Sequence, residues 1–150
     1  MNIGIKLNSV QFLKVDLRVE SFNVEITENL NSEKFTLNTL YNDKDSTAFG
    51  IQFEIILKQS DNFYLDIRAI AHFLTDKPYS QEFLDSDFVH VNAPAIAFPY
   101  IRTFISNFTL NSGYNPVILP PYNFVEMYRQ KKLSETSKIT KKSVSVKKKR

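Results

Sequence analysis

The sequence predicts an α+β fold in which a four-stranded antiparallel sheet is covered by one long helix and followed by a short C-terminal helix. Four segments in the first half of the chain alternate between apolar and polar residues, which is typical of half-buried strands. Residues 93–111 instead repeat apolar side chains at helical spacing. Short polar turns separate the later strands, and such turns favour antiparallel neighbours because parallel strands need a long crossover.

The four predicted strands cover residues 10–20, 35–41, 49–58 and 63–73. Each has alternate apolar side chains that we expect on one buried face, so a single covering layer is enough for this sheet. The side chains expected on that face are Leu13, Val15, Leu17 and Val19; Phe35, Leu37 and Tyr41; Phe49, Ile51, Phe53, Ile55 and Leu57; and Phe63, Leu65, Ile67, Ala69, Ala71 and Phe73.

The long helix is expected from about Ala93 to Asn111. Pro94 suits its first turn, and Gly113 is a typical C-terminal stop. Pro99 lies inside the helical pattern and should kink or restart the helix, because proline has no backbone N–H. The preceding connection, residues 74–91, is long for a compact domain, so we expect it to be functional or partly helical.

A second helix, with the sequence FVEMYRQKKL, is predicted after an extended, proline-containing segment at residues 115–122. Asn123 is its expected N-cap, and Glu126 occupies the capping-box position. We expect one domain, residues 1–133. Residues 134–150 are rich in Ser, Thr and Lys and have too little apolar surface to offset the entropy of ordering, so they are predicted to be a disordered basic tail.

Charge is divided unevenly along the chain. Residues 1–130 hold ten Lys and Arg against fifteen Asp and Glu, whereas residues 131–150 hold nine Lys and Arg against one Glu. The basic tail would suit nucleic acid or an anionic membrane surface, or act as solubilising charge. There is no Cys, which excludes disulfides and thiolate sites. The N-terminus has no signal-peptide pattern and no segment is apolar enough to span a membrane, so we expect a soluble, cytoplasmic protein.

Catalytic chemistry has little support in the sequence. The three glycines, Gly4, Gly50 and Gly113, are too far apart to form a phosphate-binding loop. His72 lies on the polar face of a predicted strand, where a surface role is the ordinary explanation, and His90 has no accompanying pattern of metal ligands. We therefore expect no enzyme activity, no metal and no cofactor.

The aromatic content is high, with thirteen Phe and seven Tyr in 150 residues. Rings on the strands and on the long helix are explained by a core and an oligomer interface. Rings on the connections and on the second helix are equally well explained by a groove for extended, unfolded chains, because aromatic faces and flexible Met accept many side chains. The candidate client-binding residues are Tyr79, Phe83, Phe88, Tyr122, Phe124, Met127 and Tyr128.

Residues 92–124 also carry a family resemblance. They contain Asn-Ala-Pro at residues 92–94, Phe-Pro-Tyr-Ile-Arg at residues 98–102, a glycine stop, and Pro-Tyr-Asn-Phe at residues 121–124. This order resembles the SecB protein-export chaperone family, in which an F-P-Y-x-R helix is followed by a P-V-N-F entry into the last helix. The resemblance covers about residues 10–132, where the strands match in number and order.

The resemblance implies a homotetramer, a dimer of dimers formed through the long helix. It also implies that unfolded precursors are held in hydrophobic grooves without ATP and passed to the SecA motor for export. The helix pattern agrees, because its apolar side chains span roughly 160°, whereas about 100° suffices against one sheet. The expected oligomer-interface residues are Phe98, Tyr100, Ile101 and Ile105.

The chain departs from the family at the residues that contact SecA. Family members use acidic residues on the first strand and have an acidic tail, but the corresponding positions here are Val19 and Asn23, next to Glu20, and the tail is basic. A SecB-like chaperone that protects an antitoxin of a toxin–antitoxin pair is therefore the main alternative within the family. A nucleic-acid-binding protein acting through its basic tail is an alternative of another class, and a lipid or small-ligand binder is a third.

Overall fold

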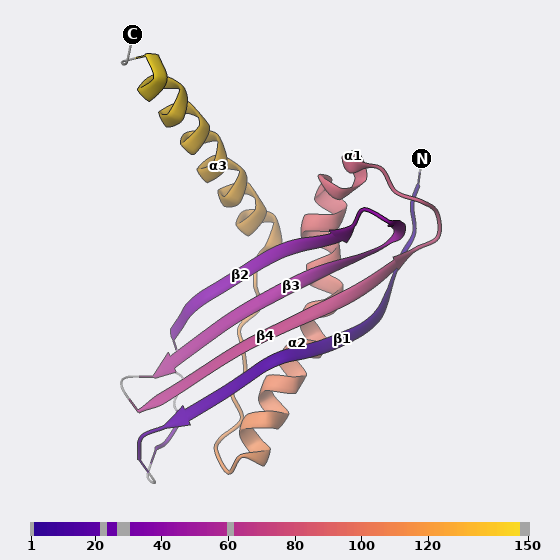
Figure 1. Ribbon diagram of the computed structural model, residues 1–150. Coiled ribbons are helices and arrows are strands. Elements are labelled where there is room, and N and C mark those ends of the chain that lie inside the picture. Colours follow the sequence, from indigo (N-terminus) through magenta and orange to yellow (C-terminus); the bar gives the residue numbers. More distant parts are fainter. Residues whose placement is uncertain (1, 22–23, 27–30, 60–61, 148–150) are drawn as a thin grey trace.

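Four long strands form one antiparallel sheet in the order β1-β4-β3-β2 (Figure 1). The computed structural model describes residues 2–21, 24–26, 31–59 and 62–147. The predicted α+β architecture is confirmed, and each strand is longer than its alternating pattern indicated. The elements are β1 (Ile5–Val19), β2 (Asn31–Asn42), β3 (Asp45–Gln59), β4 (Phe63–Thr75), α1 (Gln81–Leu84), the π-helical turn η1 (Phe88–Asn92), α2 (Ala93–Asn111) and α3 (Phe124–Lys147).

One face of the sheet is apolar and covered. Strands β2, β3 and β4 pair in sequence order, as the short turns predicted, and β1 pairs with β4, so β1 and β2 are the two edges. Buried side chains alternate from Phe49 to Leu57 in β3 and from Phe63 to Phe73 in β4, as predicted. Removing these side chains from water is the main stabilising contribution to the fold.

A bulge in β1 changes which of its residues face the core. The register with β4 shifts next to Leu13, which is 55% exposed, so its predicted place on the buried face is wrong. Phe12 takes the inner position and stacks on Phe104 of α2, with ring centroids 3.7 Å apart. Strict alternation could not indicate this, because the extra residue of a bulge exchanges the two faces of the strand. Val15, at the sheet edge, is also 36% exposed.

Helix α2 has the predicted bounds and lies against the apolar face (Figure 1). Pro94 lies in its first turn, and Gly113 has a φ of 93°, the left-handed conformation that favours glycine after a helix. The helix runs through Pro99 without restarting. Residues 95 and 96 are exposed, so water can bind the carbonyl that Pro99 leaves without a donor.

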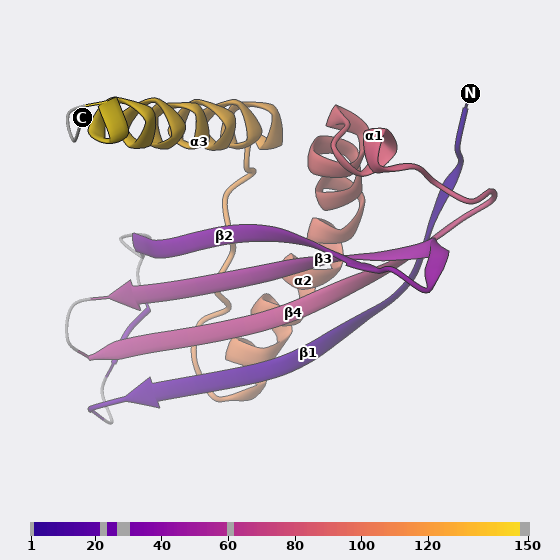
Figure 2. The ribbon, with the colours of Figure 1, turned by 45° about the horizontal axis from the view of Figure 1, so that its top comes forward.

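Hydrogen bonds from α2 hold the extended segment that follows it. The Thr109 hydroxyl accepts a hydrogen bond from the Val117 N–H at 2.9 Å, and the Ser106 hydroxyl donates to the Val117 carbonyl at 2.7 Å. Val117 and Leu119 are buried in the core. The segment returns across the covered face to the β2 side of the sheet, where α3 begins (Figure 2).

Helix α3 is longer than the ten-residue helix that the sequence indicated. Asn123 caps it as predicted, because its side chain accepts a hydrogen bond from the Glu126 N–H at 3.0 Å. The helix continues through residues 134–147, where the sequence predicted a disordered tail. Every residue from Arg129 to Ile139 is exposed, so few tertiary contacts hold this part. No Gly or Pro follows Pro121, which leaves the helical conformation available.

The connection between β4 and α2 is partly helical, as predicted, because it contains α1 and η1. The Tyr79 hydroxyl donates to the carbonyls of Ala48 and Asp45, at 2.6 and 3.2 Å, and so ties the connection to the β2–β3 hairpin. Among the described helices, none is both long and apolar enough to cross a membrane.

Candidate functional site

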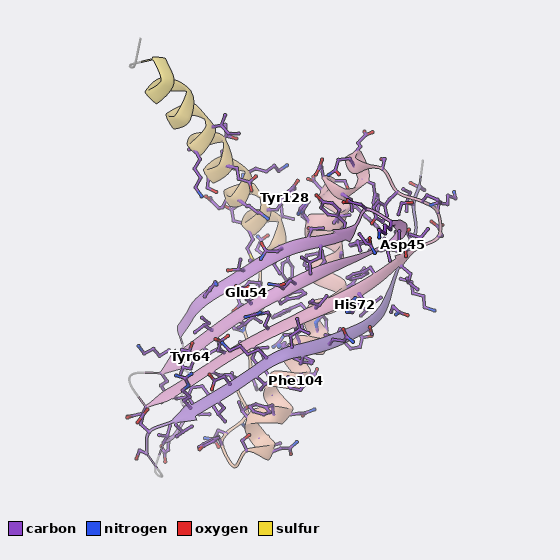
Figure 3. The ribbon with its side chains drawn as sticks, viewed as in Figure 1. Asp45, Glu54, Tyr64, His72, Phe104 and Tyr128 are labelled. Carbon is purple, nitrogen blue, oxygen red and sulfur yellow. The ribbon has the colours of Figure 1, made fainter. Side chains whose placement is uncertain are left out.

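A groove of about 410 Å³ lies between edge strand β2 and the first turns of α3. Figure 3 shows Tyr128 at the base of α3, beside the β2 side of the sheet. We call this hollow the β2–α3 groove. It is formed by five consecutive residues of β2 together with side chains from β3, η1, α2 and α3, and its lining is Phe35, Thr36, Leu37, Asn38, Thr39, Ile51, His90, Pro94, Met127, Tyr128, Gln130, Lys131 and Ser134.

Phe35 connects the groove to the hydrophobic core. Its ring stacks on Tyr122, with centroids 4.0 Å apart, and meets Phe98 edge-on at 5.9 Å. Phe124, only 7% exposed, packs against both Phe35 and Phe98. Tyr122 and Phe124 therefore support the groove from below rather than line it. Of the seven candidate client-binding residues, Met127 and Tyr128 are the two that line it.

The Tyr128 ring forms the wall of the groove nearest η1. It stacks on the His90 imidazole, with centroids 4.4 Å apart and planes 6° apart, and its hydroxyl donates to the Asp85 carbonyl at 2.9 Å. The Lys132 ammonium lies 4.2 Å from the centroid of the same ring. These contacts fix the first turns of α3 against the segment that precedes α2.

Burial lowers the pKa of His90 below the ordinary value of 6.5, and the nearby Lys131 ammonium lowers it further. A hydrogen bond to the Leu84 carbonyl and the carboxylates of Asp85 and Glu135 act in the opposite direction but do not prevail. The imidazole in the groove wall is therefore neutral at neutral pH.

The other predicted rings form a separate group, which we call the Phe49 cluster. Tyr79 and Phe83 lie 6.2 and 6.1 Å from Phe49, and Phe83 lies 6.1 Å from Phe88. None of Tyr79, Phe83 and Phe88 lines the β2–α3 groove. The structure thus divides the predicted residues into two places and does not join them in one site.

Charged groups on the other face of the sheet are paired with one another. Lys14 bonds Asp66 at 2.5 Å, and Lys34 bonds Glu54 at 2.6 Å and lowers the pKa of that carboxyl. His72, labelled in Figure 3, shares a hydrogen bond of 2.8 Å with Gln11. Across the residues that the structure describes, no group of three potential metal ligands occurs. An apolar groove, with the charges described above paired on the opposite face of the sheet, suits reversible binding better than proton transfer.

Comparison with known proteins supports a chaperone. The family model described as "Preprotein translocase subunit SecB" matches residues 11–135. The chain belongs to the SecB family. A protein-export protein SecB from Magnetococcus marinus is 27% identical over 121 residues, which cover 75% of this chain and 76% of that protein. The SecB of Nitrosomonas europaea is 49% identical over 47 residues, which cover 31% of this chain and 29% of that protein.

A solved SecB-like structure has the same fold. It is a Mycobacterium tuberculosis SecB-like chaperone in complex with a peptide from an antitoxin, and it superposes with a TM-score of 0.61 at 17% identity. The superposition covers 79% of this chain and 89% of that chain. The predicted family and fold are confirmed. SecB proteins are chaperones and not enzymes, in agreement with a sequence that lacks catalytic motifs.

Within this SecB fold, three of the four predicted interface residues belong to the chain's own core. Phe98 is 6% exposed, and Ile101 and Ile105 are completely buried. Tyr100, by contrast, is 60% exposed. A helical pattern shows how wide an apolar stripe is, but it cannot show which part of the stripe the chain's own sheet covers.

Several residues of the groove were not expected from the sequence. Phe35 and Leu37 were predicted only as core residues, and His90 was considered isolated. Their role depends on β2 being an edge strand, and strand order cannot be obtained from alternation. The aromatic content of the connections and of the second helix was the available signal, and two of the residues predicted from it, Met127 and Tyr128, line the groove.

Proposed function

We propose that this SecB-family chaperone is a holdase, which binds unfolded segments of other proteins in the β2–α3 groove without ATP. The observation that carries the proposal is an open apolar groove bordered by an edge strand. Phe35, Leu37 and Met127 offer apolar contacts that do not require one particular client side chain. A protein that binds many different sequences needs contacts of this kind. The unpaired backbone of β2 can bind an extended chain whatever its side chains are.

The groove is large enough to bind an unfolded client with about micromolar affinity. Burying one large apolar side chain stabilises a complex by about 1.5–3 kcal/mol. Several such side chains along one client, after the ordering of the client is subtracted, give affinities of about micromolar. Binding of this strength weakens as the client folds and buries its own apolar residues.

The proposed assembly is a homotetramer, and the free face of α2 supports it. Ile96, Tyr100 and Leu110 are 43%, 60% and 54% exposed. At 100° per residue they lie within about 80° of one another and form one stripe pointing away from the sheet, in which the exposed polar residues Thr103 and Asn107 lie between Tyr100 and Leu110. A second copy of the chain that covers this stripe would remove it from water. The interface would then be formed by the stripe and not by the buried side chains that the sequence suggested.

Protein export from the cytoplasm is the proposed role, with SecA as the motor that receives the clients. The acidic docking positions of the family are not reproduced here, since Val19 packs against the core and Asn23 lies outside the described residues. Glu20 is exposed beside Val19. If SecA is the partner, we expect it to use contacts other than those of the family.

A second candidate within the family is control of a toxin–antitoxin pair. The M. tuberculosis SecB-like chaperone has this fold and was solved with an antitoxin peptide. An antitoxin with an unfolded apolar segment would use the same groove as an export client. A toxin and an antitoxin encoded beside this chain would favour this role, and their absence would favour export.

The holdase proposal is tested at the groove itself. Replacing Met127→Ala together with Tyr128→Ala removes two lining side chains and should reduce suppression of aggregation of a slow-folding client. The circular dichroism spectrum and oligomer size should change little. Phe124→Ala is unsuitable for this test, because Phe124 is buried and its loss would weaken the fold.

The matched control is Leu133→Ala with Ile139→Ala, which removes two exposed apolar side chains from the same helix outside the groove lining. This control should hold clients like the wild type. Equal loss in both double variants would show that the groove is not the client site. Wild-type protein that failed to slow aggregation at a stoichiometric ratio would overturn the holdase proposal.

A further inference from the structure

The two walls of the β2–α3 groove differ in charge. The β2 wall presents Phe35, Thr36, Leu37, Asn38 and Thr39, which are all neutral. The α3 wall includes Lys131, the one lining residue among those described that is charged at neutral pH, because burial keeps His90 neutral. The groove therefore combines an apolar surface with a cation on one side.

Lys131 has no acidic partner in the described part of the chain. The nearby cations of α3 are engaged, since Arg129 pairs with Glu126, and Lys132 lies 3.6 Å from Asp87. Across the groove, the Lys34 ammonium pairs with Glu54 on the other face of the sheet. A cation at the edge of an apolar groove, with no carboxylate bound to it, is free to pair with a ligand.

Beyond the groove, the same side of α3 carries a second cation, Lys138, and one carboxylate, Glu135, which lies between Lys131 and Lys138. Lys138 follows Lys131 by seven residues, so both lie on nearly the same face of the helix, about 10 Å apart along its axis. Lys138 is exposed. An extended client covers that distance in about three residues. Two carboxylates spaced in this way could meet both cations while apolar neighbours occupy the groove.

Resting on the proposed holdase function, we propose that the β2–α3 groove selects client segments in which apolar residues are flanked by acidic ones. The apolar residues contact Phe35, Leu37 and Met127, and the carboxylates pair with Lys131 and then Lys138. Segments flanked by Lys or Arg are disfavoured, because they bring like charges together beside the groove.

The test uses the full-length protein and three fluorescent peptides of equal length: an apolar core flanked by Glu, the same core flanked by Lys, and a Ser-rich core flanked by Glu. At low salt we expect the first to bind about two- to fivefold more tightly than the second for each exposed ion pair gained. The difference should shrink at high salt. The Ser-rich peptide should bind weakly, because charge alone is not the proposed determinant.

Two variants test whether the preference for Glu-flanked peptides arises at the groove. Lys131→Glu should remove or reverse the preference for Glu-flanked peptides. Lys44→Glu, in the exposed β2–β3 turn, changes the net charge equally and should leave the preference intact. A preference for Glu that persists in Lys131→Glu, or strong binding of the Ser-rich peptide, would overturn the inference by assigning binding to the basic tail.

The same experiment separates this inference from the holdase proposal. Equal affinity for the Glu- and Lys-flanked peptides, with normal suppression of aggregation, would refute the charge preference and leave the holdase standing. Failure to bind any peptide, together with failure to suppress aggregation, would refute both.

Discussion

At the residue scale, Tyr128 joins three kinds of interaction in one side chain. Its ring stacks on His90 and lies beside the Lys132 ammonium, and its hydroxyl bonds the Asp85 carbonyl. The ring is thus both a wall of the groove and a link between α3 and the segment before α2. Met127, which makes none of these polar contacts, should therefore also be replaced alone, because its loss affects the groove without loosening that link.

We expect His90 to make the stability of the fold depend on pH. Its pKa is lowered in the folded chain, so the unfolded chain binds the proton first as pH falls. The stabilising contribution is fully present above the unfolded pKa of about 6.5 and is lost as pH falls through the lower folded pKa. Thermal melts between about pH 7 and pH 5 should show this loss in the wild type, and His90→Phe, which cannot be protonated, should show less of it.

Direct titration of His90 checks the predicted direction of its pKa shift. The charged groups that face His90 are Lys131 and Glu135 of α3 and Asp85 before η1. Since the two carboxylates favour protonation, a His90 resonance that titrated at or above the ordinary value would show that they outweigh burial and Lys131. In that case the predicted direction would be wrong.

The sequence could predict individual side chains only where their partners are nearby in the chain. The Asn123 cap and the Gly113 stop depend on adjacent residues, and both are confirmed. His90 depends on Tyr128 of a different helix, and Phe35 depends on Tyr122. Such pairs are created by the tertiary fold, which is why the rings were expected while their places in the groove were not.

At the element scale, the sequence predicted the bounds of α2 correctly but underestimated the lengths of the four strands and of α3. The bounds of α2 follow from proline at its start and glycine after its end, and these act locally. The face of β1 reverses at Leu13 because pairing with β4 absorbs an extra residue there. Composition predicted a disordered tail from residue 134, but residues 134–147 continue α3, since Lys, Ser and Thr tolerate a helix that has little else to hold it.

Deleting residues 134–150 tests what this part of α3 contributes. The deletion removes seven basic residues and one acidic residue, which changes the net charge from +3 to −3. Because residues 134–139 are exposed, we expect the sheet and α2 to be unaffected, as judged by circular dichroism and thermal melting. Any binding to nucleic acid or anionic vesicles should disappear, because these depend on the lost positive charge.

The salt dependence of nucleic-acid binding is the control for the tail. Binding by the full-length chain should weaken steeply with salt, as release of counterions requires. Truncated protein that still bound DNA at moderate salt would show that the tail is not the electrostatic site. Loss of the fold on truncation would instead show that the helical segment contributes to the domain.

At the scale of the whole molecule, two of the apolar surfaces that the described residues leave uncovered bear on client binding and assembly. One is the β2–α3 groove, which must stay uncovered if it is the client site that we propose. The other is the stripe of Ile96, Tyr100 and Leu110 on the free face of α2. A chain that exposed both at high concentration would tend to aggregate, so covering the stripe in an assembly while leaving the grooves open is consistent with a chaperone.

The assembly is tested by introducing one charge on each side of α2. Tyr100→Asp places a carboxylate on the free face and should split the proposed tetramer into smaller species that remain folded. An unpaired charge in an apolar contact costs several kcal/mol, roughly. Ile101→Asp is the matched comparison, because Ile101 is completely buried against the chain's own sheet. It should unfold the chain rather than dissociate it, and light scattering with circular dichroism distinguishes the two results. A wild-type protein that was monomeric at micromolar concentration, or a Tyr100→Asp variant of unchanged size, would show that this face of α2 is not the interface.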